Sequence, residues 1–138
     1  MDIKLTNREL KNCHNALLEL SRADGLSQKT NYWIGKVVDQ ANKFMEQLQK
    51  INNEKVIELG EDRGGGNFYV KEENKKKYDE FLNELLDDTC EIRNFRKIKL
   101  DELLSAKNLK PTAFIGLYWL LEEEESENDE SEIQDQTE

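Results

Sequence analysis

Residues 27–59 read SQKTNYWIGKVVDQANKFMEQLQKINNEKVIEL. Apolar side chains recur there every three or four positions, the spacing that places them on one face of an α-helix. These positions are Ile34, Val37, Val38, Ala41, Phe44, Met45 and Leu48. No proline interrupts the stretch, and at ~1.5 Å of rise per residue, about thirty-three residues span roughly 50 Å. The sequence therefore predicts one long helix along which the other elements pack.

A shorter helix is predicted before it. Thr6 and Glu9 have the spacing of a capping box, in which each side chain accepts a hydrogen bond from the other residue's backbone amide. An apolar seam follows, and Gly25 is suited to a left-handed helix stop. Ser27 is the expected cap of the long helix. With so short a connection, the two helices should form an antiparallel hairpin. The seam consists of Leu10, Cys13, Leu17 and Leu20.

The long helix should change its packing partner near its end, because Asn52 and Lys55 interrupt the apolar stripe. Three glycines, residues 64–66, then predict a break in the chain. Residues 67–71 predict a strand, residues 74–88 a third helix, and residues 89–100 a strand that pairs with the first. Pro111 fits the first position of a closing helix over residues 114–121. The expected fold is mostly α (α+β): a long antiparallel helical hairpin, a third helix, a minimal β-sheet and a short C-terminal helix.

Charge separates the chain into two parts. The 138 residues have a formal net charge of -10, with thirty acidic and twenty basic residues. Ten of the acidic residues lie from Glu122 onward, where there is no Lys or Arg, so the rest of the chain is neutral. We therefore expect a single helical domain over residues 1–124 and a disordered acidic tail over residues 125–138. The tail is a solubilising appendage, an autoinhibitory arm or part of a DNA mimic.

Neither a signal peptide nor a run of eighteen apolar residues is visible, which predicts a soluble, cytoplasmic protein with two reduced cysteines. Catalysis by Cys13 would need a base, but adjacent helical residues such as Cys13 and His14 diverge by ~100°. No metal-ligand set is present, since Lys11 stands three residues before the single histidine. We expect no enzyme activity, no cofactor and no bound metal.

Two surfaces are candidates for binding. Positive charge gathers around Phe95, which predicts a polyanion patch formed by Arg93, Arg96, Lys97 and Lys99. Nucleic acid is the less favoured ligand there, because the neutral body and the acidic tail oppose it; the tail itself is a competing ligand in cis. The second candidate is a partner interface on the closing helix, formed by Ile115, Tyr118 and Trp119. The alternative is that Trp119 is buried within the monomer.

The order of these features resembles a family of small uncharacterised helical proteins encoded by tailed phages and prophages. The similar segments are residues 15–20 (NALLEL), 26–36 (LSQKTNYWIGK), 66–74 (GNFYVKEEN) and 81–86 (FLNELL), within a match over about residues 5–125. The resemblance implies a phage context and the host cytoplasm, and it supplies no activity or functional residues.

The function expected from these observations is that of a non-catalytic phage protein that binds another protein, either itself or a host or virion component. Two alternatives stay open. One is a virion morphogenesis factor, such as a chaperone or connector. The other is an acidic inhibitor of a nucleic-acid-binding enzyme.

Overall fold

The computed structural model describes residues 1–107, 109, 110, 114 and 116–122. Helices dominate this part of the chain, and three two-stranded sheets accompany them, which confirms the expected mostly α class. The helices are α1 (Asn7–Ser21), α2 (Gln28–Leu59), α3 (Lys75–Asp87) and α4 (Leu100–Leu104), with 3-10 turns η1 (Glu72–Asn74) and η2 (Tyr118–Leu120). The strands are β1 (Ile3–Thr6), β2 (Gly60–Asp62), β3 (Phe68–Val70), β4 (Thr89–Ile92), β5 (Ile98–Lys99) and β6 (Leu121–Glu122). The expected disordered tail, residues 125–138, lies outside the described residues.

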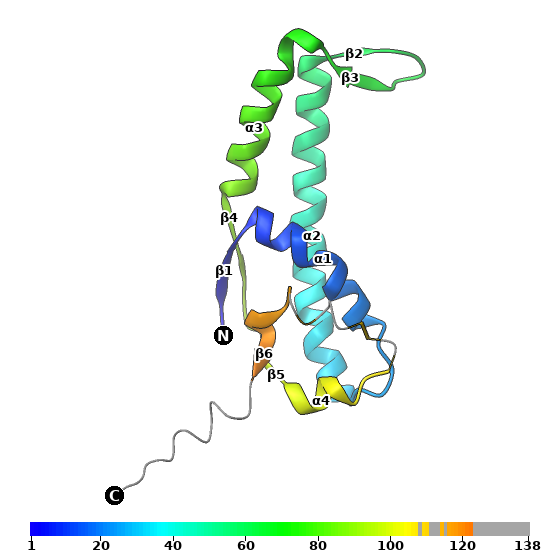
Figure 1. Cartoon of the computed structure of the whole chain (residues 1–138), viewed down its shortest axis with the longest axis vertical. Helices are drawn as coiled ribbons and strands as arrows, with labels where there is room; N and C mark the ends of the chain where they lie inside the picture. The colour runs from blue at the N-terminus through cyan, green and yellow to red at the C-terminus, as the bar shows by residue number, and fades with distance from the viewer. Residues whose placement is uncertain (108, 111–113, 115, 123–138) are drawn as a thin grey trace, which may run out of the picture.

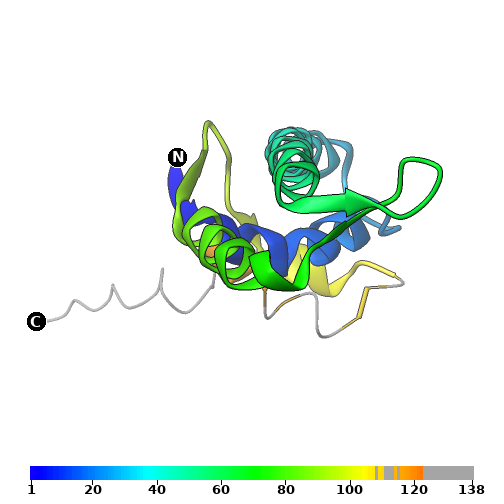
Figure 2. The same ribbon diagram turned by 90° about the horizontal axis from the view of Figure 1, so that it is seen from above.

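The 32-residue helix α2 extends along most of the molecule (Figure 1). It begins as expected at Ser27, whose Oγ accepts a hydrogen bond from the Thr30 amide at 3.2 Å. Helix α1 crosses the first half of α2 obliquely, and Figure 2 shows α1 and α3 on the same side of α2. The seam of α1 and the first half of the α2 stripe are buried in one core cluster. The predicted helix pair is therefore confirmed.

Helix α1 starts with the predicted capping box at Thr6 and Glu9. It ends earlier than expected, because its C-terminal cap is Arg22 rather than a residue next to Gly25. Gly25 does have a positive φ of 93°, a conformation that favours glycine. It serves the connection instead, where an added Cβ would lie 3.0 Å from the Ser105 carbonyl oxygen.

Helix α3 covers the second half of α2, at the position where the stripe is interrupted. The hydroxyl of Tyr78 donates to Asn52 Oδ1 at 2.6 Å, and the Lys55 ammonium lies 5.0 Å from the centre of the Phe81 ring. The predicted change of packing partner is confirmed by these contacts. The second half of α2 is also the less buried half, because only Leu59 is buried there among the described residues of α2 beyond Ala41.

The strand pairing differs from the prediction. Strand β3 pairs antiparallel with β2 as a hairpin whose loop holds three glycines at positive φ. Strand β4 pairs instead with β1, which the sequence analysis did not identify, in a register that places Leu5 opposite Cys90. The predicted pairing of residues 67–71 with residues 89–100 is therefore wrong. Adjacent strands joined by a short glycine-rich loop close a hairpin locally, whereas pairing β3 with β4 would have to bridge the whole of α3.

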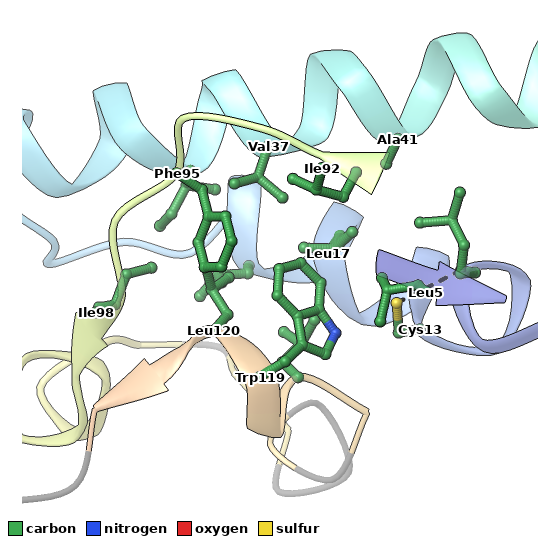
Figure 3. Packing of buried hydrophobic residues seen from close by; sticks show 14 of the residues in the cluster. Leu5, Cys13, Leu17, Val37, Ala41, Ile92, Phe95, Ile98, Trp119 and Leu120 are labelled. Carbon is green, nitrogen blue, oxygen red and sulfur yellow. Dashed lines mark hydrogen bonds between the residues drawn. The ribbon is translucent and has the colours of Figure 1, made fainter. Parts of the chain in front are cut away.

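The predicted closing helix is also wrong over residues 116–122, which form a turn, η2 and β6. Leu117, Trp119 and Leu120 are all buried there, although positions 117 and 119 would point about 200° apart on an α-helix. An irregular backbone lets all three side chains enter the core, as Figure 3 shows for Trp119 and Leu120. Pro111 lies outside the described residues.

Candidate functional site

An open surface cavity of about 800 Å³ lies beside the first turns of α2. Its walls come from α2, from the segment between β4 and β5, from α4 and from β6. Four cationic side chains line it against two acidic ones, so the cavity favours an anion. The lining residues are Met1, Lys29, Thr30, Trp33, Phe95, Arg96, Lys97, Ile98, Lys99, Glu102 and Glu122.

The segment that follows β4 is fixed to the body by hydrogen bonds on both sides. The side chain of Gln40 on α2 accepts from the Arg93 amide and donates to the Arg93 carbonyl, both at 2.8 Å. Asn94 adopts a positive φ of 54°, and its amide donates to Asp2 Oδ1 at 3.0 Å. These contacts set the path of the chain into the cavity wall.

Buried and exposed side chains are interspersed along this wall. Phe95 and Ile98 enter the core, while Arg96, Lys97 and Lys99 are exposed. The Phe95 ring packs edge-to-face on Trp119, with ring centroids 5.5 Å apart. Because the two apolar side chains are anchored, the three cationic side chains between and after them must project outward.

The aromatic part of the wall is Trp33. The Arg96 guanidinium carbon lies 4.7 Å from the centroid of the Trp33 ring, and the Lys36 ammonium lies 5.0 Å from it. Cation–π contacts of this kind contribute about 0.5–1 kcal/mol at exposed sites. Arg96 is therefore held against α2 at the edge of the cavity, and the Trp33 ring is already in contact with two cations.

The acidic side chain of Glu102 is committed to the start of α2. Its carboxylate accepts hydrogen bonds from the Ser27 hydroxyl at 2.7 Å and from the Ser27 amide at 3.1 Å. Hydrogen bonds from the Thr30 side chain and then from Ser27 lower the pKa of Glu102 below its ordinary value. Since the N-terminus of a helix carries partial positive charge, this carboxylate stabilises the start of α2, and the four cationic side chains still outnumber Glu102 and Glu122 in the cavity wall.

The predicted polyanion patch is brought together in part. Arg96, Lys97 and Lys99 line the cavity, but Arg93 does not, and its Nε lies 3.0 Å from Glu91 Oε1. Phe95 is 1% exposed, so its ring offers no surface on which a nucleic-acid base could stack.

Two further lining residues, Lys29 and Trp33, come from α2 and were not among the predicted site residues. Neither residue belongs to the apolar stripe that begins at Ile34, and this position outside the stripe is the feature of the sequence that could have indicated a role at the surface. A Trp that is off the buried face of an amphipathic helix needs another partner, and here that partner is Arg96.

The predicted partner interface is not supported at Trp119. Its side chain is 4% exposed and lies among Leu5, Cys13 and Phe95 in the core, so the expectation that it projects outward is wrong (Figure 3). Tyr118 is 67% exposed and stays a candidate contact residue. Ile115 lies outside the described residues.

Cys13 and His14 face different surroundings. Burial raises the pKa of the Cys13 thiol to about 11, although a hydrogen bond from the Trp119 side chain lowers it in part. His14 Nε2 is 2.8 Å from Asn42 Oδ1. A thiol in this environment is almost entirely protonated at neutral pH, whereas a nucleophile must be a thiolate.

Other features of the described residues add no chemistry. They contain no group of three or more His, Cys, Asp or Glu side chains arranged to hold a metal ion. No helix among them has the length and apolarity that crossing a membrane requires. A second hollow of about 640 Å³ along α2 is lined by both acidic and basic side chains, including Glu46, Lys50 and Glu54, and so selects no ligand charge.

Comparison with protein-family models, with curated proteins and with solved structures finds no significant match to this chain.

Proposed function

We propose that this chain is a non-catalytic binding protein whose basic cavity takes an acidic segment of another protein. The observation that supports this most directly is the clustering of Lys29, Arg96, Lys97 and Lys99 around one concave surface. Carboxylates suit such a site, because Arg offers a planar pair of N–H donors and each Lys offers a compact positive charge.

An acidic protein segment fits the cavity better than a nucleic acid does. Binding of single strands relies on aromatic faces on which bases stack. Phe95 is buried, and the Trp33 ring already contacts the cationic groups of Arg96 and Lys36. The acidic residues that follow Leu121 begin at the cavity and would repel a long polyanion. A short acidic peptide carries less negative charge than a long nucleic acid, so these acidic residues repel it less.

The resemblance to phage proteins supplies a proposed setting. In a phage-infected cell the partner is a host protein, a virion protein or a second copy of this chain, and the place of action is the host cytoplasm.

The test is the binding of a fluorescently labelled oligoglutamate peptide to the full chain, followed by anisotropy. The cavity variant is Lys97→Glu with Lys99→Glu, and the matched control is Lys76→Glu with Lys77→Glu on the exposed surface of α3. Both variants change the net charge equally. An exposed ion pair contributes about 0.2–1 kcal/mol, and a reversal turns attraction into repulsion, so we expect about tenfold weaker binding in the cavity variant alone.

Two outcomes would overturn the proposal. Equal losses in the cavity variant and the α3 control would mean that net charge, and not the cavity, determines binding. Cavity-dependent binding of a single-stranded oligonucleotide that is tighter than the binding of the peptide would make nucleic acid the ligand.

A further inference from the structure

The last residue that the structure describes, Glu122, lies at the basic cavity. Strand β6 pairs in parallel with β5, and this places Glu122 opposite Lys99 in the register. Glu122 also lines the cavity. The residues that follow are therefore tethered at the rim, with no intervening linker.

Those residues have the charge that the cavity favours. Residues 123–138 include nine acidic side chains and no basic one. An extended chain of sixteen residues reaches at most roughly 50 Å, far more than is needed to cross a cavity of this size. Reach and charge both allow several carboxylates to contact Lys29, Arg96, Lys97 and Lys99.

We propose that residues 123–138 occupy the basic cavity of the same molecule and compete there with the acidic segment of a partner. This inference rests on the proposed function, because it names the regulation of the same site. A short tether gives an effective concentration in the millimolar range, well above the micromolar concentration of a second copy in solution. The arrangement within one molecule is therefore favoured over exchange of tails between two.

The competition sets a threshold for the partner. If a free acidic peptide binds the open cavity with a Kd of about 0.1 mM, a tethered competitor at about 1 mM with similar affinity weakens its apparent binding about tenfold. A partner must then present its acidic groups in a better arrangement than the tail does, or bind through additional contacts elsewhere. Weakly acidic proteins are excluded by this device.

The experiment keeps the full length of the chain and neutralises the tail. All nine acidic residues of 123–138 are changed to Gln or Asn, which moves the formal net charge from -10 to -1. Binding of the labelled oligoglutamate peptide is measured by anisotropy for the natural chain and for this neutral-tail variant. We expect about tenfold tighter binding to the variant. The same neutralisation in the Lys97→Glu, Lys99→Glu background controls for net charge, and there we expect little gain.

The outcomes separate this inference from the proposed function. Equal and cavity-dependent binding by the two chains would overturn the inference and leave the function intact. Absence of peptide binding to both chains would overturn both proposals. If tail neutralisation also tightens peptide binding in the Lys97→Glu, Lys99→Glu background, the tail acts through long-range charge repulsion and does not occupy the cavity, which would overturn the inference. Masking that disappears on dilution, together with a dimer in sedimentation, would assign the tail to a second copy and overturn the arrangement within one molecule.

Discussion

Replacing Trp119 by Ala tests the packing of the C-terminal segment most directly. Trp119 is 4% exposed, and its ring meets Phe95 edge-to-face at 89°. Truncation of a buried Trp or Phe to Ala costs about 3–5 kcal/mol, and loss of an aromatic pair adds about 0.5–1.5 kcal/mol. We therefore expect the free energy of unfolding to fall by about 4 kcal/mol, which is a large part of the about 5–15 kcal/mol of a whole domain.

The assay is unfolding by heat and by urea, followed by circular dichroism. For a chain of this size, a loss of 1 kcal/mol lowers Tm by about 4 °C, so Trp119→Ala should melt about 15 °C below the natural protein. The neighbouring residue provides the matched control. Tyr118 is 67% exposed, and Tyr118→Ala should change stability by no more than about 0.5 kcal/mol.

A Trp119→Ala protein that melts within about 2 °C of the natural chain would refute this reasoning. If that protein also changed from an oligomer to a monomer in light scattering, Trp119 would be an exposed anchor after all. Equal destabilisation by the two variants would mean that burial of the Trp119 ring is not the main interaction that holds this segment against the core.

Three further results are expected. Leu17→Asp should destabilise by about 3–5 kcal/mol because Leu17 is fully buried, whereas Leu48→Asp should cost only about 1 kcal/mol because Leu48 is half-buried; equal urea midpoints would contradict the difference. Glu102→Gln should lower stability at neutral pH. The folded-state pKa of Glu102 lies below its ordinary value of 4.5, so its contribution to the free energy of unfolding is complete above pH 4.5 and is lost as pH falls through the folded pKa. A stability difference between the variant and the natural protein that stays constant down to low pH would exclude this linkage. Burial raises the pKa values of both Cys13 and Cys90, so a maleimide reagent should label neither thiol in the native protein and both in urea, as counted by mass spectrometry; rapid native labelling would show that the core is open.

The helices were predictable from the sequence because their signals are local. A capping box at Thr6, a cap at Ser27 and a stripe of period 3.6 each involve residues within a few positions of one another. Even the change of partner on α2 was visible, since Asn52 and Lys55 are polar residues in an apolar stripe.

The sheets and the C-terminal segment were not predictable in the same way. The pairing of β1 with β4 joins residues almost ninety positions apart, and neither strand alone specifies its partner. Residues 114–121 are apolar nearly all round, which is consistent with a helix as well as with an irregular segment buried on several sides. In the structure Leu117, Trp119 and Leu120 are all buried, with Trp119 against Phe95, and such contacts with distant residues are not visible in the apolar pattern of the segment.

The candidate site shows the same division. Arg96, Lys97 and Lys99 form a cluster in the sequence and were found there. Lys29 and Trp33 lie more than sixty positions earlier, and they join the site only because α2 passes beside the segment between β4 and β5. A charge count along the chain cannot find a residue that completes a site from another element.

The uneven packing of α2 should also divide its backbone amides into two kinetic classes. Between Thr30 and Ala41, one face of α2 buries four side chains, those of Thr30, Ile34, Val37 and Ala41, whereas beyond Ala41 only Leu59 is buried among its described residues. Amide hydrogens in a segment that is anchored in the core exchange with deuterium only when the whole domain opens, whereas a helical segment with few buried side chains opens locally at lower free energy. The amides at the C-terminal end of α2, next to β2 and β3, should therefore exchange first, and the amides of the first turns, which form the cavity wall, should exchange last. Events at the far end of the molecule would then leave the binding surface unchanged.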